Sequence, residues 1–337
     1  MIRQRREGEL SAAGTETSRR RKTVTIAVWV LVLDAALILA FGVISADQVF
    51  LSGASFQIIA LGAAMPVVLA VGFALLLGAG EFDLSLGANL VLSSVVGAKL
   101  MTAVGGGAWG VATGVAACVA VGAAVGAFNG VVVARARVNS LIATLGTTGV
   151  ASGLALVLTD AADVPVSPAL QDGFGLATVA GVPLPALVAL AVAVSATLVM
   201  TYTRMGIRLL AIGSLRSAAA RAGVRVDRFV LVLFAAVGAL AGLAGFLDLA
   251  RFATTTVSGH TLDPLAAAAA AVIGGTAISG GRVSILGAVA GALLAVILQT
   301  GLVIVGLPAF YQQITIGLVL IAAVAGHQWR HPRPEAD

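Results

Sequence analysis

The feature that most constrains this chain is a long stretch without charge near its C-terminus. Between Arg282 and Arg330 lie 47 residues that include no Asp, Glu, Lys or Arg, interrupted by Gly306, Leu307 and Pro308. A helix of about 20 apolar residues crosses the roughly 30 Å of bilayer hydrocarbon with every backbone hydrogen bond made internally. The stretch therefore predicts two membrane-spanning helices joined at the Gly-Leu-Pro turn.

The overall composition also favours a membrane protein. Hydrophobic residues make up 59% of the 337 residues and charged residues 10%, whereas soluble domains carry about 25% charged residues. The excess of Lys and Arg does not indicate nucleic-acid binding, because the arginines lie in short loops beside apolar runs. Cys118 is the single cysteine, which excludes an intrachain disulfide, and its apolar surroundings predict a packing role.

The apolar runs predict an all-α polytopic membrane protein with about ten transmembrane helices. Residues 1–22 are expected to form a disordered cytoplasmic tail, residues 23–326 a transmembrane domain, and residues 327–337 a second cytoplasmic tail. The third and eighth runs are short enough to be broken or re-entrant, near 80–87 and 274–282. The ten expected spans are 24–45, 55–78, 84–101, 108–134, 139–159, 185–203, 229–247, 263–276, 283–305 and 308–326.

The charges between the runs predict the orientation in the membrane. With a cytoplasmic N-terminus, the arginines of 135–137, those of 204–228 and Arg282 all lie on the cytoplasmic side. The 160–184 loop, which has three aspartates and no basic residue, then lies outside. This asymmetry follows the positive-inside rule and predicts that both termini are cytoplasmic. The first run lacks an obvious cleavage site, so an uncleaved first span is expected rather than a signal peptide.

A glycine-rich stretch at 78–87 follows the second run and includes Glu81, Asp83 and Ser85. Glycines weaken a helix, and carboxylates in lipid are costly, so the stretch must line a cavity, lie inside the protein or reach an aqueous edge. One interpretation is that it lines a transport pathway. The other is a turn between helices in which Asp83 or Ser85 caps the third helix.

A second glycine-rich stretch, 273–282, includes Gly274, Gly275 and Thr276 and interrupts the apolar run that begins at Asp263. Paired interrupted segments in the two halves of a chain point to the central site of a transporter. The same glycine pairs could instead permit close helix packing.

The third stretch, 204–228, contains six arginines and one acid. A short helix is expected over 215–222, with Ser214 as its cap and Gly223 as its stop, and with Leu215 and Ala219 on one side and Arg216 and Arg221 elsewhere. It is interpreted either as a basic loop on lipid headgroups or as a helix that docks into a soluble partner.

Several kinds of chemistry have no candidate residues. Neither lysine lies in a Gly-x-x-x-x-Gly-Lys-Ser/Thr loop, and no zinc-protease, Cys-x-x-Cys or nucleophile-elbow motif is present, so an enzyme is not expected. His260 is expected to be a surface residue of an outer loop. Asp34, within the first span, is expected to be a satisfied polar contact with a neighbouring helix, with a functional role as the alternative.

These motifs together resemble those of the permease subunits of bacterial ABC importers for ribose and related monosaccharides, a family that also includes branched-chain amino-acid permeases. The resemblance covers roughly residues 50–326 and rests on several motifs in the same order. Two departures stand out: Glu81 replaces a usual glycine, and Ser214-Leu215-Arg216-Ser217 replaces a common Gly-Asn-Pro-Glu. The matching segments are 80–87, 143–146, 181–185, 211–224, 262–281 and 284–287.

The resemblance implies a fold like that of type II ABC importers and a dimer, with a second copy or a paralogue, in the bacterial cytoplasmic membrane. Two cytoplasmic P-loop ATPase subunits would dock on 214–223, and an extracytoplasmic solute-binding protein would contact the outer loops, including 160–185. ATP would bind the partner chain, so no cofactor is expected on this one. The expected pathway residues are Glu81, Asp83, Ser85, Gly274, Gly275 and Thr276; the expected ATPase-coupling residues are Ser214, Leu215, Arg216, Ala219, Arg221 and Gly223.

The expected cargo is a small polar solute, a monosaccharide first, with an amino acid or a nucleoside as alternatives. A different class of function also remains open. In a secondary transporter driven by an ion gradient, Asp34, Glu81 or Asp83 would carry a proton or a sodium ion.

Overall fold

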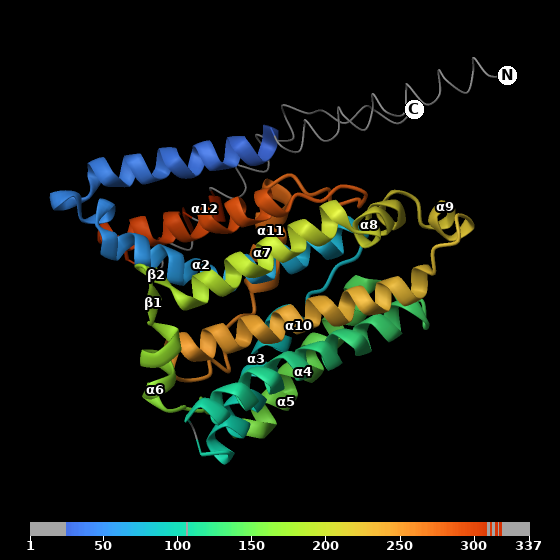
Figure 1. Cartoon of the computed structure of the whole chain (residues 1–337), viewed down its shortest axis with the longest axis horizontal. Coiled ribbons are helices and arrows are strands. Elements are labelled where there is room, and N and C mark those ends of the chain that lie inside the picture. Colours follow the sequence, from blue (N-terminus) through green and yellow to red (C-terminus); the bar gives the residue numbers. More distant parts are fainter. Residues whose placement is uncertain (1–24, 106, 309–310, 312–313, 316, 319–337) are drawn as a thin grey trace.

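The computed structural model describes residues 25–105, 107–308, 311, 314–315 and 317–318, and most of this part is helical (Figure 1). Eight of the described helices are long and apolar enough to cross a membrane. They are Thr25–Ile44, α2 (Gly53–Gly78), α3 (Leu86–Ala103), α4 (Gly107–Ala134), α5 (Ser140–Thr159), α7 (Leu184–Tyr202), α10 (Val226–Phe252) and α12 (Ile285–Ile304).

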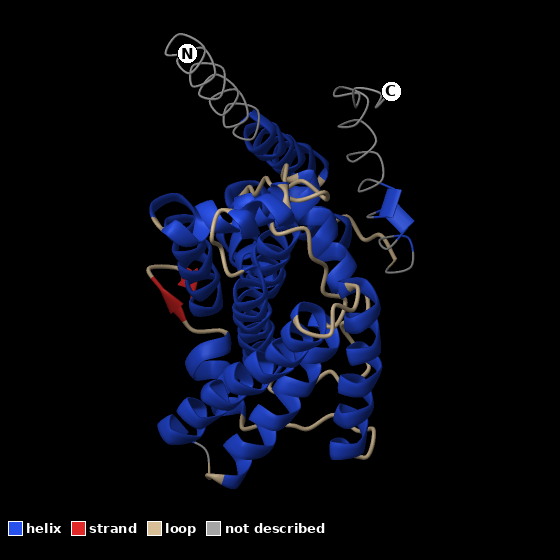
Figure 2. Cartoon of the chain, turned by 90° about the vertical axis from the view of Figure 1, so that its right-hand side faces the viewer, coloured by secondary structure: helices blue, strands red, loops and turns tan. Residues whose placement is uncertain are grey.

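The remaining elements are short. Figure 2 shows two small strands at the edge of an otherwise helical bundle. The short elements are η1 (Ala46–Leu51), α6 (Pro168–Leu170), η2 (Gln171–Gly175), β1 (Thr178–Val179), β2 (Val182–Pro183), α8 (Arg204–Ser214), α9 (Arg216–Arg221) and α11 (Asp263–Ile273).

The all-α polytopic architecture expected from the sequence is confirmed, including its two interruptions. The chain leaves helical geometry between α2 and α3, where Gly80 has a φ of +77°. The eighth expected span is α11, which ends at Ile273 after 11 residues and is too short to cross a bilayer alone. The tenth expected span, 308–326, lies largely outside the described residues, and both expected tails lie wholly outside them.

The tightest helix pair of the bundle is α4 with α10, and glycines bring it together. Along α4 a buried small residue recurs every fourth position, and α10 carries a matching Gly238-x-x-x-Gly242. A Cβ at Gly122 would collide with the carbonyl of Gly238, and one at Gly126 with the carbonyl of Phe234. The backbones therefore touch without intervening side chains, as small-xxx-small motifs permit in membranes. The α4 residues of this row are Gly110, Gly114, Cys118, Gly122, Gly126 and Gly130.

The two ends of the bundle differ in character. At one end lie α8 and α9, with the arginines of 204–228, and we call this the arginine-rich end (Figure 1). At the opposite end, residues 160–183 fold into α6, η2 and the β1–β2 hairpin. This segment is fastened to the residues that end or follow α10, since Val166 N–H donates to the Ala253 carbonyl at 2.9 Å and Gln171 Nε2 to the Arg251 carbonyl at 2.7 Å.

Candidate functional site

The three motifs noted in the sequence meet at one place in the fold. The N–H of Gly281, in the second interruption, donates to the carbonyl of Gly78, at the end of α2, at 2.9 Å. Gly213, in the last turn of α8, lies against both, because a Cβ there would collide with the Gly78 carbonyl and the Gly281 nitrogen. The end of α2, the loop after α11 and the end of α8 are therefore in direct backbone contact.

Glu81 lies directly beyond this junction and forms an ion pair with the short helix α9. Its Oε1 is 2.7 Å from Nη1 of Arg216; the Glu81 side chain is 6% exposed and that of Arg216 is 47% exposed. The pair opens onto a polar pocket of about 410 Å³. Other residues lining this pocket are Gly80, Val133, Ala134, Arg137, Val138, Asn139, Ser140 and Asp227.

The extended segment between α2 and α3 is held by side chains of α5. The N–H of Phe82 donates to Ser140 Oγ at 3.2 Å, and the N–H of Leu84 donates to Thr144 Oγ1 at 3.1 Å. These donors have no helical partner, so within a membrane domain they need such acceptors. Neither Ser140 nor Thr144 was among the predicted site residues, although hydroxyls one helical turn apart in an apolar run mark a polar face.

Asp83 and Ser85 are fully buried and belong to a polar network between α3, α4 and α5. Asp83 Oδ1 accepts from the Ser85 N–H at 2.8 Å and from Ser85 Oγ at 2.5 Å. Asn129 Nδ2 on α4 donates to Ser85 Oγ at 2.8 Å, and Thr147 Oγ1 on α5 donates to Asn129 Oδ1 at 2.6 Å. Asp83 thus caps the turn that leads into α3, whereas the Ser85 hydroxyl caps nothing. Asn129 was missed, although it is the one polar amide in an otherwise apolar span.

In the second interruption, Gly274 and Thr276 are buried and Gly275 has a φ of +95°. A Cβ at Gly274 would collide with the backbone of Gly287 in α12, so this glycine permits close packing. Thr276 Oγ1 accepts from the N–H of Ser284 at 3.1 Å and fastens the loop to the start of α12. Their assignment to a pathway stays a prediction.

The short basic helix forms, but its start differs from the expectation. Ser214 is the last residue of α8 and does not cap α9, whose N-cap is Leu215 with no side-chain hydrogen bond. A one-residue kink at extended Leu215 separates the two helices instead. Gly223 follows α9 with a φ of +84°, the left-handed geometry that ends a helix, as expected. Ala219 is buried against the bundle, whereas Leu215 and Arg221 are exposed.

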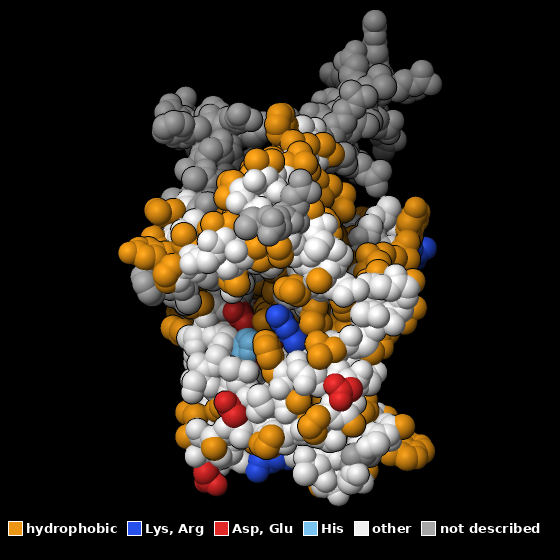
Figure 3. Space-filling model, turned by 90° about the vertical axis from the view of Figure 1, so that its left-hand side faces the viewer, with side chains coloured by type: hydrophobic (Ala, Val, Ile, Leu, Met, Phe, Trp, Pro, Cys, Tyr) orange, Lys and Arg blue, Asp and Glu red, His pale blue; other side chains and the backbone are white. Residues whose placement is uncertain are grey.

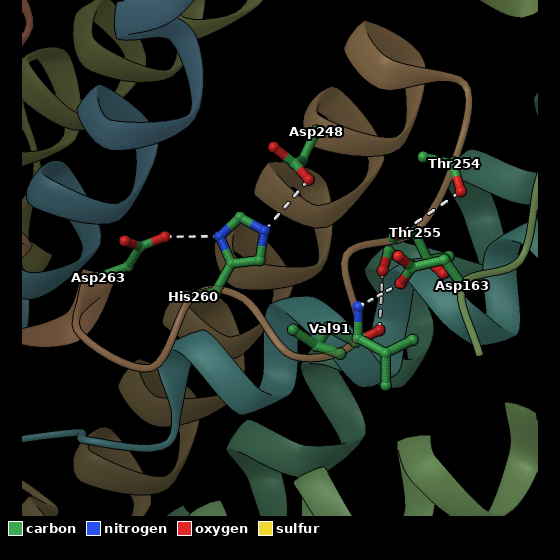
Figure 4. Close-up of polar contacts among 9 residues, drawn as sticks. Val91, Asp163, Asp248, Thr254, Thr255, His260 and Asp263 are labelled. Atoms are coloured by element: carbon green, nitrogen blue, oxygen red, sulfur yellow. Dashed lines mark hydrogen bonds and ion pairs between the residues drawn. The ribbon is translucent and has the colours of Figure 1, made fainter. Parts of the chain in front are cut away.

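The expectation that His260 is a surface residue is wrong, because its side chain is only 10% exposed and lies at the centre of an ion cluster (Figure 4). Nδ1 is 2.6 Å from Asp263 Oδ2 at the start of α11, and Nε2 is 3.2 Å from Asp248 Oδ2 on α10. Carboxylates only accept hydrogen bonds, so both ring nitrogens donate and the imidazole is charged. The sequence signal was the His-x-x-Asp spacing in a loop between two apolar helices.

Burial by itself lowers the pKa of His260, but the hydrogen bonds and charges of Asp248 and Asp263 outweigh it and raise the pKa to about 10. Figure 3 faces the end opposite the arginine-rich one, and there a histidine, an acidic and a basic side chain gather in a hollow of the surface. Across the described residues, no three His, Cys, Asp or Glu side chains are placed to hold a metal ion.

Asp34, expected to be a satisfied contact, is buried without one. It is 5% exposed in the helix Thr25–Ile44, and neither carboxylate oxygen has a hydrogen-bond partner among the residues that the structure describes. An isolated buried carboxylate is costly in its charged form, and residues of this kind in membrane spans are often functional.

Comparison with known proteins is consistent with this geometry. Residues 55–324 match the family model described as "Branched-chain amino acid transport system / permease component". The chain is 31% identical to the ribose import permease protein of Escherichia coli over 263 residues, which cover 76% of this chain and 80% of that protein. No solved structure matches.

Two further relatives are sugar permeases. The chain is 35% identical to the D-allose transport system permease protein of Escherichia coli, with 74% of this chain and 78% of that protein covered. It is 30% identical to the L-arabinose ABC transporter permease protein of Azospirillum brasilense, with 92% and 91% covered. The chain therefore belongs to the family of permease components of branched-chain amino acid transport systems, together with the ribose, allose and arabinose permeases.

Proposed function

We propose that this chain is the transmembrane permease subunit of an ABC importer for a small polar solute, a monosaccharide first. One observation carries the proposal: α9 is a short, exposed helix that is joined by Arg216 and Glu81 to the place where both helix interruptions meet. A partner that moves α9 would move those interruptions with it. The chain itself would be non-catalytic and bind no cofactor, with ATP hydrolysed on a separate P-loop ATPase subunit.

The arginine-rich end would face the cytoplasm. The six arginines of 204–228, together with Arg135 and Arg137, gather there, and basic loops are retained on the cytoplasmic side. The folded 160–183 segment and the His260 cluster would then face outward, where an extracytoplasmic solute-binding protein delivers the solute. The site for the ATPase would comprise Ser214, Leu215, Arg216, Ala219, Arg221 and Gly223.

Coupling requires that ATPase contacts at α9 differ between two states of the membrane domain. Arg216 is suited to this role because one part of its side chain is exposed to a partner while Nη1 holds the buried Glu81. Movement of α9 would pull on Glu81 and on the segment that ends in the Asp83–Asn129 network. The solute pathway would include Glu81, Asp83, Ser85, Gly274, Gly275 and Thr276, between this chain and a second copy or a paralogue.

The monosaccharide assignment is supported by the printed names of the relatives, which are permeases for ribose, D-allose and L-arabinose. In such importers a separate binding protein provides much of the selectivity for the solute. The pathway of this chain therefore need only admit a polar molecule of the size of a monosaccharide. The family description also includes branched-chain amino acid transport, so branched-chain amino acids are the first alternative cargo.

The test is affinity purification of the full chain from its native membrane in mild detergent, with mass spectrometry of the proteins that accompany it. We expect a P-loop ATPase with the wild-type chain and its loss with Gly223→Pro, because proline cannot adopt the φ of +84° that ends α9. Gly181→Pro is the matched control, since Gly181 has a φ of +81° at the opposite end.

Purification of the wild-type chain alone would contradict the proposal and favour a transporter driven by an ion gradient, with Asp34 first among its candidate carriers. Equal loss of the ATPase in both proline variants would remove α9 as the docking site.

A further inference from the structure

An apolar groove runs along the outside of the bundle between α7 and α10. It has a volume of about 490 Å³ and its floor includes Leu75 of α2. One wall runs from Val188 to Met200 on α7, and the other from Phe229 to Leu240 on α10. At a rise of about 1.5 Å per residue these walls are roughly 17 Å long, close to half of the roughly 30 Å hydrocarbon core. The groove therefore has the length of one acyl chain in one leaflet.

The lining of the groove suits hydrocarbon and not a polar solute. Among its lining residues in the described chain, Ser195 alone has a side-chain oxygen, and this hydroxyl donates to the Ala191 carbonyl of its own helix at 2.7 Å. A sugar or an amino acid in the groove would find no polar partner there, at a large desolvation cost. The residues on its outer edge are exposed, so lipid has direct access to the groove; they are Ala191, Ser195 and Val199 of α7 and Val232 and Ala236 of α10.

One end of the groove is basic. Met205 and Leu209 of α8 and Phe229 of α10 close the groove at the arginine-rich end. Each of these three residues is directly preceded by an exposed arginine, and consecutive residues on a helix lie about 100° apart, so each arginine flanks the groove instead of lining it. The three arginines form no ion pair with a carboxylate in the part of the chain that the structure describes. They are Arg204, Arg208 and Arg228.

We propose that this groove is a binding site for one anionic phospholipid, with an acyl chain between α7 and α10 and its phosphate headgroup at Arg204, Arg208 and Arg228. Guanidinium groups bind phosphate oxygens with paired hydrogen bonds, and basic pockets between membrane helices favour anionic headgroups. Tyr202, 80% exposed beside the same end, has the position of an interfacial aromatic anchor. Because α8 continues into α9, the lipid would lie directly beside the proposed ATPase site.

The site is tested by native mass spectrometry of the purified full chain titrated with phosphatidylglycerol or with phosphatidylcholine of the same acyl chains. We expect the wild-type chain to bind one phosphatidylglycerol about tenfold more tightly than phosphatidylcholine. The variant Arg204→Gln/Arg208→Gln/Arg228→Gln is expected to lose this preference. Arg135→Gln/Arg221→Gln/Arg225→Gln, which removes the same charge from exposed arginines that precede no groove residue, is expected to keep it.

A second variant separates the groove from the headgroup. Ala236 lies on the groove wall of α10 and is exposed, so Ala236→Phe fills the groove without a charge change. We expect this variant to abolish the tight binding of phosphatidylglycerol and to leave only weak, non-selective lipid binding.

The proposal is overturned if the wild-type chain shows no preference, if both triple variants lose it equally, or if Ala236→Phe has no effect. It is also overturned if glycerol phosphate displaces the lipid at equal concentration, because the site would then be an anion site without a chain. Binding to the monomer but not to a dimer would assign the groove to a second copy. None of these measurements needs an ATPase or a solute, so the lipid site and the importer function can fail separately.

Discussion

Arg216 Nη1 lies 2.7 Å from Oε1 of Glu81, and this contact joins α9 to the interruption between α2 and α3. Both residues lie in the two segments noted in the sequence as departures from the motifs that the chain resembles, and the structure brings these two segments together. The sequence alone suggested that Glu81 adds a second carboxylate, besides Asp83, to a pathway. Its pairing with an arginine of the basic loop also makes it a connection between that loop and the membrane helices, and its place in the pathway stays a prediction.

We expect Arg216→Glu to reduce solute uptake at least tenfold, because the nearly buried Glu81 would lose its partner and face a like charge. A hydrogen bond to a charged group contributes about 1.5–3 kcal/mol, and a tenfold change in rate corresponds to about 1.4 kcal/mol, so the loss of this contact is large enough. The double variant Glu81→Arg/Arg216→Glu is expected to recover part of the uptake. Reconstituted vesicles with the complete transporter provide the measurement, with uptake and ATPase rate recorded together.

The matched control is Arg221→Glu, since Arg221 is exposed on the same helix and forms no ion pair among the described residues. It is expected to alter ATPase stimulation but not the stability of the chain in detergent. Equal uptake defects in Arg216→Glu and in the double variant would show that the two charges act separately.

Asp83 has a structural explanation that a conservative variant can isolate. Asp83→Ala would leave the Ser85 and Asn129 donors unsatisfied, and we expect it to lower stability by about 1–3 kcal/mol and reduce uptake with it. Asp83→Asn keeps one acceptor oxygen at the same place and is expected to retain most of both. Thermal unfolding in detergent and uptake are the measurements. A stable Asp83→Asn variant without uptake would instead identify the charge itself as part of the pathway.

The His260 cluster predicts a pH dependence with a definite sign. The folded-state pKa of about 10 lies above the ordinary value of 6.5, so the stabilisation is complete below pH 6.5 and is lost as the pH rises through 10. We therefore expect the melting temperature of the wild-type chain to fall toward that of His260→Gln between pH 6.5 and 10.5. A constant difference between the two proteins over this range would contradict the charged state of the cluster.

The α4–α10 contact predicts a sharp difference between glycines. Gly126→Val would drive a side chain into the Phe234 carbonyl, and we expect a loss of about 3 kcal/mol of stability, seen as poor yield and a lowered melting temperature. Gly149→Ala on α5, where no atom beyond the adjoining residues and backbone of its own helix lies within 4 Å of the added Cβ, is expected to be neutral or stabilising. Similar yields and melting temperatures for the two variants would contradict close backbone packing of α4 against α10.

Asp34 distinguishes the importer from its main alternative. Asp34→Leu removes a buried carboxylate whose oxygens have no partner in the described residues, so we expect a higher melting temperature and unchanged ATP-driven uptake. A normally expressed Asp34→Leu protein with no uptake would assign Asp34 to ion or proton transfer.

Much of the fold was predictable because the bilayer allows few solutions. A charge-free run of sufficient length must be a helix, and a glycine-rich run with carboxylates, as at 80–87, or with hydroxyls, as at 274–282, interrupts one, so both segments were found from composition alone. The end of α9 at Gly223 was predictable too, since a left-handed position favours glycine.

Contacts between distant segments were not predictable, because no local pattern encodes them. Nothing near Glu81 indicates Arg216, which lies 135 positions away. Asn129 and His260 each looked isolated in the sequence, and only the packing of α4 against α3 and of α10 beside α11 supplies their partners. The start of α9 was missed for a different reason: an extended Leu215 replaces the side-chain cap that Ser214 was expected to provide.

The glycine row of α4 also limits how this protein can change shape. Side chains that interlock can exchange rotamers and let helices slide in small steps, but touching backbones have no such freedom. To slip along α10 and regain the same fit, α4 would have to move a whole four-residue repeat, about 6 Å at once. The two helices must therefore move together as one rigid body. Any change between inward- and outward-facing forms has to occur at other helix contacts, where side chains separate the backbones.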